Sequence, residues 1–266
     1  MSVDMNLLKQ LREMTFAPLK DCKEALVETN GDLEQAQELL RKKGIMKAGS
    51  KAERATNEGI VKAIQKDGRL AGIKLLCETD FVAKNDDFIK LADDVLDKLV
   101  SSKKAAKNLE EVDAAVLEEV NTMVAAFVGK IGENMKLAEV ILDNQNAYVY
   151  NHPGNKVASI IYYEWGNEDA AKEVALQVTA MNPTYVSFDD VPADYRNSLM
   201  EEFKKEMEGS TKPQNIIDQI LEGKLKKSLA ELVLFEQEYI RDAGKKVREI
   251  LPAEMKIKGY VRMSVR

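Results

Sequence analysis

Two stretches of this sequence each contain a pair of strand-forming runs joined by a tight turn and followed by a helix. In the first stretch, the runs EGIVKAIQ and LAGIKLLCE flank Asp67-Gly68. In the second, AYVYN and KVASIIYYEW flank a turn over residues 152–155. Asp-Gly between apolar runs favours a two-residue hairpin, and the strands of a hairpin are antiparallel. The repeated order predicts an α+β protein whose core holds two similar α+β subdomains with antiparallel sheets.

Each predicted hairpin leads into a helix that begins at an asparagine. Asn85 precedes a segment with apolar residues at helical spacing, and Asn167 precedes a second such segment. An asparagine side chain accepts a hydrogen bond from the first free N–H groups of a helix. Another helix is predicted near 110–128. The closing run IKGYVRMSVR has strand composition, and we expect it to add a strand to the second sheet.

The remaining segments read as helical. Amphipathic stretches within the first 45 residues predict a compact three-helix unit, with Leu11 on the apolar stripe of its first helix and Gly44 ending its third. Residues 191–232 predict a helical hairpin whose return helix is capped by Thr211. Its apolar stripe is narrow, which is typical of an antiparallel coiled coil that projects from a body.

These patterns divide the chain into six predicted segments. They are a three-helix domain (1–45), a basic linker (46–57), an N-terminal core subdomain (58–140), the first part of a C-terminal core subdomain (141–190), a coiled-coil hairpin (191–232) and the return strands of the C-terminal subdomain (233–266). The stretch 41–54 carries six basic residues and one acidic residue. We interpret it as solvated, because no aromatic residues interleave with the charges to stack on nucleic-acid bases.

Composition narrows the classes of function. The 266 residues carry a net charge of −6, whereas nucleic-acid-binding proteins usually carry a basic surplus. One histidine and two separated cysteines exclude a multi-histidine metal site and disfavour a disulfide scaffold. There is no GxxxxGK[ST] phosphate loop, and no apolar run approaches the ~20 residues of a membrane span. We expect a cytoplasmic binding protein without cofactor or metal and without direct contact to nucleic acid or membrane.

The run CETDFVAKN joins the first hairpin to its helix and holds the clearest candidate for a contact residue. Phe81 lies between Asp80 and Lys84 in this short connection. One interpretation turns Phe81 inward as a core residue and leaves Asp80 as a turn residue. The other exposes Phe81 as an apolar wedge beside an acid, as at a binding hot spot. Periodicity alone does not separate the two.

His152, the only histidine, lies in the second hairpin turn with Pro153 and Gly154. It is either a solvated loop residue or a general base. A base needs a nucleophile and an orienting acid nearby, and nothing in the sequence nominates them.

The sequence resembles the elongation factor Ts family over nearly its whole length. The matching segments are DCKEALVETNGDLEQAQELLRKKG in the N-terminal unit, CETDFVAKN at 77–85, KIGEN at 130–134, MNPTYVSFDDVP at 181–192, KPQNIIDQILEGKLKK at 212–227 and the closing GYVRMSVR. Members of this family are guanine-nucleotide exchange factors for the translational GTPase EF-Tu. The resemblance implies a ubiquitin-associated-like (UBA-like) helical domain, a two-part α+β core and a protruding coiled coil.

The resemblance also implies a partner and a set of contact residues. The partner is EF-Tu, GDP-bound or nucleotide-free, and the protein is not an enzyme with covalent chemistry of its own. In the family, the TDFV segment enters the partner's GTPase domain and disturbs the helix that helps hold the nucleotide-bound magnesium. Carried across, this segment is Thr79, Asp80, Phe81 and Val82, with Phe81 as the wedge. The other implied partner-contacting residues are Leu11, Leu19, Ile131, Gly132, His152 and Gly154.

Two turns depart from the family pattern, and two other classes of function stay open. A small turn that is commonly Thr-Gly-Ala-Gly in the family reads Thr-Phe-Ala-Pro here, over residues 15–18. The family's histidine turn is glycine-rich, whereas here it reads His-Pro-Gly-Asn-Lys over 152–156. An adaptor would bind a helix or a ubiquitin-like partner through its first 44 residues, which leaves CETDFVAKN without a role. A hydrolase would use Asp80 and His152. The sequence does not set the oligomeric state.

Overall fold

The computed structural model describes residues 4–15, 17, 19–51 and 53–266, and it describes side chains for all of these except 44–50. The chain forms two compact units. The first comprises Met1–Gln145, Asn151–Ala158 and Met263–Arg266, and the second comprises Asn146–Tyr150 and Ser159–Arg262. Both units mix helices with small sheets, as the sequence predicts. Within the described residues, no helix is long and apolar enough to cross a membrane.

The first unit begins with three helices, α1 (Met5–Thr15), α2 (Leu19–Glu28) and α3 (Leu33–Lys51). They enclose a small core made by Leu8, Leu11, Cys22, Ala25, Leu26 and Ala36. The prediction that the third helix ends at Gly44 is wrong, because α3 continues to Lys51. A glycine inside a helix costs only about 1 kcal/mol relative to alanine, and the residues after Gly44 include good helix formers. The predicted basic linker therefore starts within α3.

A three-stranded sheet follows in the same unit. Strands β1 (Glu58–Lys66), β2 (Arg69–Cys77) and β3 (Met135–Asp143) lie in the order β1-β2-β3, and both neighbouring pairs are antiparallel. The predicted Asp67-Gly68 hairpin is confirmed: both residues have positive φ, at 52° and 74°, as a tight hairpin turn requires.

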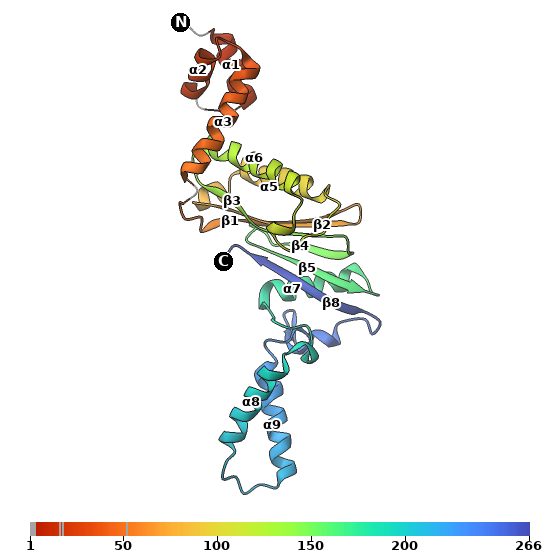
Figure 1. The fold of residues 1–266 in the computed structure, drawn as a ribbon. Helices are drawn as coiled ribbons and strands as arrows, with labels where there is room; N and C mark the ends of the chain where they lie inside the picture. The colour runs from red at the N-terminus through yellow and green to blue at the C-terminus, as the bar shows by residue number, and fades with distance from the viewer. Residues whose placement is uncertain (1–3, 16, 18, 52) are drawn as a thin grey trace. The chain divides into compact units, whose positions relative to one another are not determined.

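Two helices cover one face of this sheet, α5 (Asp86–Val100) and α6 (Ala114–Ile131) (Figure 1). They bury an apolar core against the sheet, and this core includes the fully buried Phe88. The sequence placed the second of these helices near 110–128, so it starts later and ends later than predicted.

The second unit contains most of a three-stranded sheet in the order β4-β5-β8, built from β4 (Ala147–Asn151), β5 (Val157–Glu164) and β8 (Lys256–Ser264). Helix α7 (Glu168–Met181) follows β5 and packs against this sheet through Val174 and Val178. The hairpin-then-helix order thus occurs twice, and the closing strand joins the second sheet, as predicted. The sequence did not reveal a small antiparallel pair, β6 (Glu238–Tyr239) and β7 (Asp242–Lys246).

The helices α8 (Ala193–Glu206) and α9 (Gln214–Leu229) run side by side in the second unit (Figure 1). Thr211 is not the cap that the sequence predicted. Helix α9 starts after Pro213, which occupies the N-cap position with φ −54°. The proline ring has no polar atom, so this end of the helix has no side-chain capping bond. The remaining elements are one helical turn, α4 (Asp80–Ala83), and 3-10 turns at Leu109–Glu111, Phe188–Asp190, Leu234–Glu236 and Val247–Glu249.

Candidate functional site

Phe81 points into solvent from the connection between β2 and α5. It is 82% exposed, whereas Val82 and Ala83 immediately after it are 7% and 4% exposed. Both of these neighbours belong to the core beneath the sheet-covering helices. The structure therefore decides between the two interpretations of Phe81, in favour of the exposed side chain. It also shows that Val82 is an anchor of the segment rather than part of its outer surface.

The short helix α4 gives Phe81 its direction. Thr79 is the N-cap, and its hydroxyl oxygen accepts a hydrogen bond from the Val82 N–H at 3.4 Å. The Ala83 N–H donates to the Thr79 carbonyl at 3.2 Å, and the Lys84 N–H donates to the Asp80 carbonyl at 3.1 Å. Asn85 then caps α5 through its Oδ1 atom, as the sequence predicted. One turn of helix thus separates two buried elements and projects its second residue outward.

Asp80 is the first residue of α4 and lies next to Phe81. The Lys84 ammonium donates a hydrogen bond to Asp80 Oδ2 at 2.6 Å, one helical turn further on. That bond lowers the pKa of Asp80 below its usual value. The segment therefore presents an ionised carboxylate, already partnered by a lysine, beside an exposed aromatic ring.

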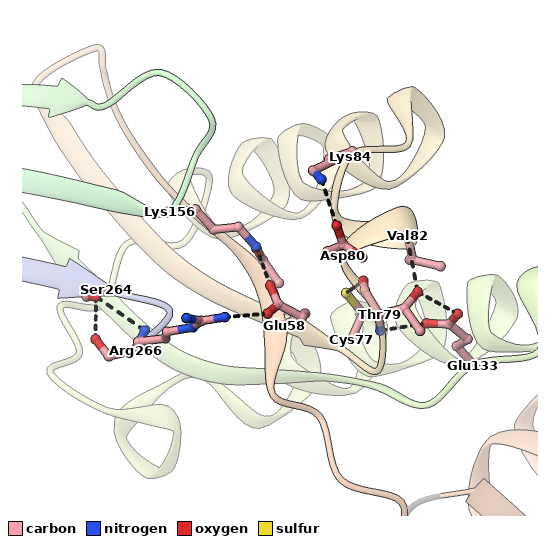
Figure 2. A network of polar contacts seen from close by, with 11 residues as sticks. Glu58, Cys77, Thr79, Asp80, Val82, Lys84, Glu133, Lys156, Ser264 and Arg266 are labelled. Carbon is pink, nitrogen blue, oxygen red and sulfur yellow. Dashed lines mark hydrogen bonds and ion pairs between the residues drawn. The ribbon is translucent and has the colours of Figure 1, made fainter.

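Two carboxylates, Glu133 and Glu78, join this segment to the KIGEN motif, which begins in the last turn of α6. Figure 2 shows the bonds between Glu133 and Thr79. Glu133 accepts hydrogen bonds from both the N–H and the hydroxyl of Thr79, at 3.1 and 2.8 Å. Glu78 in turn accepts a hydrogen bond from the Asn134 N–H at 2.5 Å. The side-chain amide of Asn134 donates to the Arg54 carbonyl at 2.7 Å. The CETDF and KIGEN segments therefore hold each other through reciprocal side-chain-to-backbone bonds.

Cys77 ends β2 directly below this segment. Burial, reinforced by the nearby Glu133 charge, raises the pKa of the Cys77 thiol to about 12. The protonated thiol donates a hydrogen bond to the Thr79 carbonyl at 3.2 Å. Because the thiolate is the reactive form of cysteine, this residue has a supporting role and not a nucleophilic one.

Glu58, at the start of β1, gathers two cations beside the same segment (Figure 2). Lys156 donates to one carboxylate oxygen at 2.7 Å and Arg266 to the other at 3.0 Å. These bonds, the Lys156 bond first, lower the pKa of Glu58. Lys156 also donates to the Gly59 carbonyl at 2.9 Å. The end of the chain and the end of the histidine turn are thereby fixed to β1.

Taken together, these side chains suit contact with a macromolecule better than catalysis. An exposed apolar side chain beside a charged group, on a support held by buried neighbours, is the arrangement of an interface hot spot. Among the described residues, no group of three or more histidine, cysteine, aspartate or glutamate side chains is placed to hold a metal ion.

Comparison with known proteins agrees with this interpretation. The family model for elongation factor Ts matches residues 78–266, which include the segment at Phe81, the KIGEN motif and both helices of the hairpin. The chain belongs to the elongation factor Ts family. It is 37% identical to an elongation factor Ts of Hydrogenobaculum sp., over 100% of this chain and 99% of the relative. It is 36% identical to that of Aquifex aeolicus, over 94% and 92% of the two chains, and 36% identical to that of Pediococcus pentosaceus, over 99% and 92%.

The remaining predicted contact residues of this family member differ in accessibility. Leu19 is 51% exposed. Ile131 and Gly132 are half-buried, and Gly132 ends α6 in the left-handed conformation at φ 90°. Leu11 is fully buried between the first three helices, so its predicted role as a contact residue is corrected to a core role.

The histidine turn is exposed at both His152 and Gly154. The turn is closed by a hydrogen bond from the His152 N–H to the Val157 carbonyl at 2.9 Å. Asn151, which precedes it, bonds both the N–H and the carbonyl of Ala63 in β1 at 2.8 Å. The turn is thus fixed to the sheet that carries the Phe81 segment.

Sequence reasoning missed the supports of the site. It nominated Ile131 and Gly132 within KIGEN but not Glu133, and it gave no role to Glu78 or Cys77. The available signal was that both carboxylates lie inside the two motifs that carried the family resemblance.

Proposed function

We propose that this protein is the guanine-nucleotide exchange factor that acts on EF-Tu during translation elongation. It binds GDP-bound EF-Tu, promotes release of GDP and holds the nucleotide-free form until GTP enters. The observation that carries the proposal is the 82% exposure of Phe81 beside ionised Asp80. Most of this aromatic side chain is in contact with water. A partner that covers it removes a large apolar surface from water, and this favours binding.

The proposed mechanism needs no bond between this protein and the nucleotide. Thr79, Asp80, Phe81 and Val82 form the segment that enters the GTPase domain. Phe81 wedges against the helix near the magnesium site, and Asp80 exchanges its Lys84 partner for polar groups of that helix. Val82 holds the segment to its own core. Displacing that helix weakens the contacts of the metal and of the helix terminus, which supply much of the nucleotide affinity.

Such a mechanism is a coupling between two binding events. If this protein lowers the affinity of EF-Tu for GDP by some factor, GDP must lower the affinity of EF-Tu for this protein by the same factor. The protein therefore performs no covalent step.

We further propose that α1 to α3 form a UBA-like domain that adds affinity, and that α8 and α9 form a coiled coil. Ile131, Gly132, Leu19 and the turn with His152 and Gly154 are proposed as additional contacts.

The deciding experiment follows GDP release directly. EF-Tu loaded with a fluorescent GDP analogue is mixed with this protein and excess unlabelled GDP, and the release rate is measured against protein concentration. An exchange factor raises the rate until it saturates. An adaptor, even one that binds EF-Tu, leaves the release rate at its spontaneous value, and that outcome would reject the proposal.

A further inference from the structure

The interlock between Glu133 and Thr79 has a direct bearing on how Phe81 is held. Thr79 has one hydroxyl hydrogen, and the 2.8 Å distance to Glu133 directs that hydrogen toward the carboxylate. The lone pairs of the same oxygen are then free to accept the Val82 N–H. The second Glu133 oxygen takes the Thr79 N–H. Glu133 therefore satisfies the Thr79 backbone and orients the hydroxyl that caps α4.

Helix α4 needs such support because it is only four residues long. A single helical turn fixes several backbone dihedrals for very few hydrogen bonds, and it is unfavourable on its own. Val82 and Ala83 anchor its buried side. The exposed side, which carries Phe81, has its direction set by the backbone of Asp80 and Phe81. That backbone begins at Thr79, so a loose Thr79 leaves the wedge free to sample several directions.

We propose that Glu133 is a positioning residue for nucleotide exchange: by holding Thr79 it keeps α4 formed and Phe81 in the direction that engages the partner. This role rests on the proposed function and assigns a task to a KIGEN residue outside the predicted contact set. Glu133 acts through Thr79 and needs no contact of its own with EF-Tu. A pre-formed wedge loses less conformational freedom on binding, which is the general advantage of a pre-organised contact.

The first measurement compares Glu133→Ala with a matched control, Glu139→Ala. Glu139 lies on β3, is exposed and pairs with Lys74 at 3.0 Å. The Glu139→Ala substitution therefore removes the same charge from the same unit and leaves the bonds of Thr79 intact. In the fluorescent GDP assay, we expect Glu133→Ala to lower the maximal release rate at saturating protein by about tenfold, the effect of losing hydrogen bonds to a charged group. The half-saturating concentration should change by less than about twofold, because the other contacts remain. Glu139→Ala should match the wild type in both.

A double mutant separates positioning from a general loss of structure. If Glu133 acts only by aiming Phe81, adding Glu133→Ala to Phe81→Ala should lower the maximal rate by less than about twofold further. Full additivity of the two effects would overturn the positioning role. Glu133→Gln keeps an oxygen that can accept the Thr79 hydroxyl but not the N–H as well, so its rate should lie between those of the wild type and Glu133→Ala.

A measurement on the isolated protein tests the role of Glu133 independently of any effect on GDP release. In the isolated protein, amide hydrogen exchange at Ala83 and Lys84 should become about tenfold faster in Glu133→Ala, while amides in β1 and β2 keep their wild-type rates. Unchanged exchange at Ala83 and Lys84 would overturn the role of Glu133 and leave the proposed function standing. A wild-type protein that does not accelerate GDP release would reject the proposed function, whatever the amides show.

Discussion

Two strand-to-helix connections in this molecule have the same order of features but differ in the contacts that hold their aromatic residue. Both the β2–α5 connection and the β5–α7 connection leave a hairpin strand, pass an exposed aromatic residue and enter a helix capped by an asparagine. Phe81 is 82% exposed in the first and Trp165 is 70% exposed in the second. Asn85 caps α5 by accepting the Asp87 N–H, and Asn167 caps α7 by accepting the Ala170 N–H.

The difference lies in what fixes the aromatic residue. Phe81 lies in a helical turn whose first residue is held by Glu133, a residue distant in the sequence. Trp165 instead has φ 51° and is followed by Gly166 at φ 140°, so the local backbone sets its direction. A left-handed conformation costs a non-glycine residue roughly 1–2 kcal/mol. An exposed aromatic residue alone is thus a weak indicator of a site, and a long-range support for its backbone is a stronger one.

The largest expected difference is in the free energy of unfolding when Gly59, near the first connection, or Gly166, in the second, is replaced by alanine. A Cβ atom on Gly59, which pairs with Leu76 in β2, would lie 2.7 Å from the Leu76 Cα atom, and φ is 151°. Backbone cannot move aside cheaply, so Gly59→Ala should lower the free energy of unfolding by about 3 kcal/mol or more. On Gly166 the Cβ would meet the flexible Met255 side chain at 2.8 Å, and we expect a loss of about 1–2 kcal/mol. Urea denaturation of both variants measures the two losses, and equal values would contradict this reasoning.

The second contrast concerns function. Phe81→Ala should weaken the complex with nucleotide-free EF-Tu by roughly thirtyfold, since truncating a hot-spot residue costs about 2 kcal/mol or more. Trp165→Ala should leave that affinity within about twofold. Both variants should keep the wild-type free energy of unfolding within about 0.5 kcal/mol, because both side chains are exposed. If Trp165→Ala proved the more damaging to affinity, the assignment of the site to the first connection would be wrong.

The third contrast uses pH. The pKa of Cys77 is raised to about 12 in the folded protein from an ordinary value of 9.0. Between these values the unfolded chain loses the proton while the folded protein keeps it, so stability is fully present below pH 9 and falls as the pH rises. The loss is at most about 1.4 kcal/mol per pH unit. Between pH 8 and 11, the free energy of unfolding measured by urea denaturation should fall less steeply in Cys77→Ser than in the wild type. In the second unit, Tyr260→Phe should reduce the fall only above pH 10, because burial raises that pKa from 10.0 to about 12.

The smallest expected effect is a gain. Asparagine tolerates the left-handed conformation better than tryptophan does, so Trp165→Asn should raise the free energy of unfolding by up to about 1 kcal/mol. Phe81→Asn is the matched variant in a helical turn and should bring no such gain. A stabilisation of the same size in both variants would point to removal of exposed apolar surface and not to relief of backbone strain.

The elements with local signals were predictable from the sequence, and the supports of the site were not. Asp67-Gly68, Asn85 and Asn167 each act within a few residues, and each is where the sequence placed it. The direction of Phe81 depends on burial of the next two residues, which periodicity cannot resolve in a four-residue turn. The bonds from Glu133 join residues 54 positions apart, and a carboxylate in the sequence does not reveal a distant partner.

The errors have equally physical causes. Gly44 and Thr211 were given roles as helix boundaries from residue type alone, whereas the real ends depend on the neighbouring residues. Leu11 was part of an apolar stripe that indicated burial, and the family resemblance assigned it a contact role that burial excludes. The strands β6 and β7 escaped notice because Glu238–Lys246 is rich in charge and lacks an alternating pattern.

The long-range bonds under Phe81 also set the order in which the site can be made. The first hairpin and the start of α5 are local in sequence and can form as soon as they leave the ribosome. Thr79 and Glu78 must wait for Glu133 and Asn134, which lie 54 and 56 residues further along the chain. Closing a loop of that length costs entropy before any bond repays it, so the wedge is fixed late in folding. A nascent chain that ends before Glu133 carries the TDFV segment but cannot yet brace it.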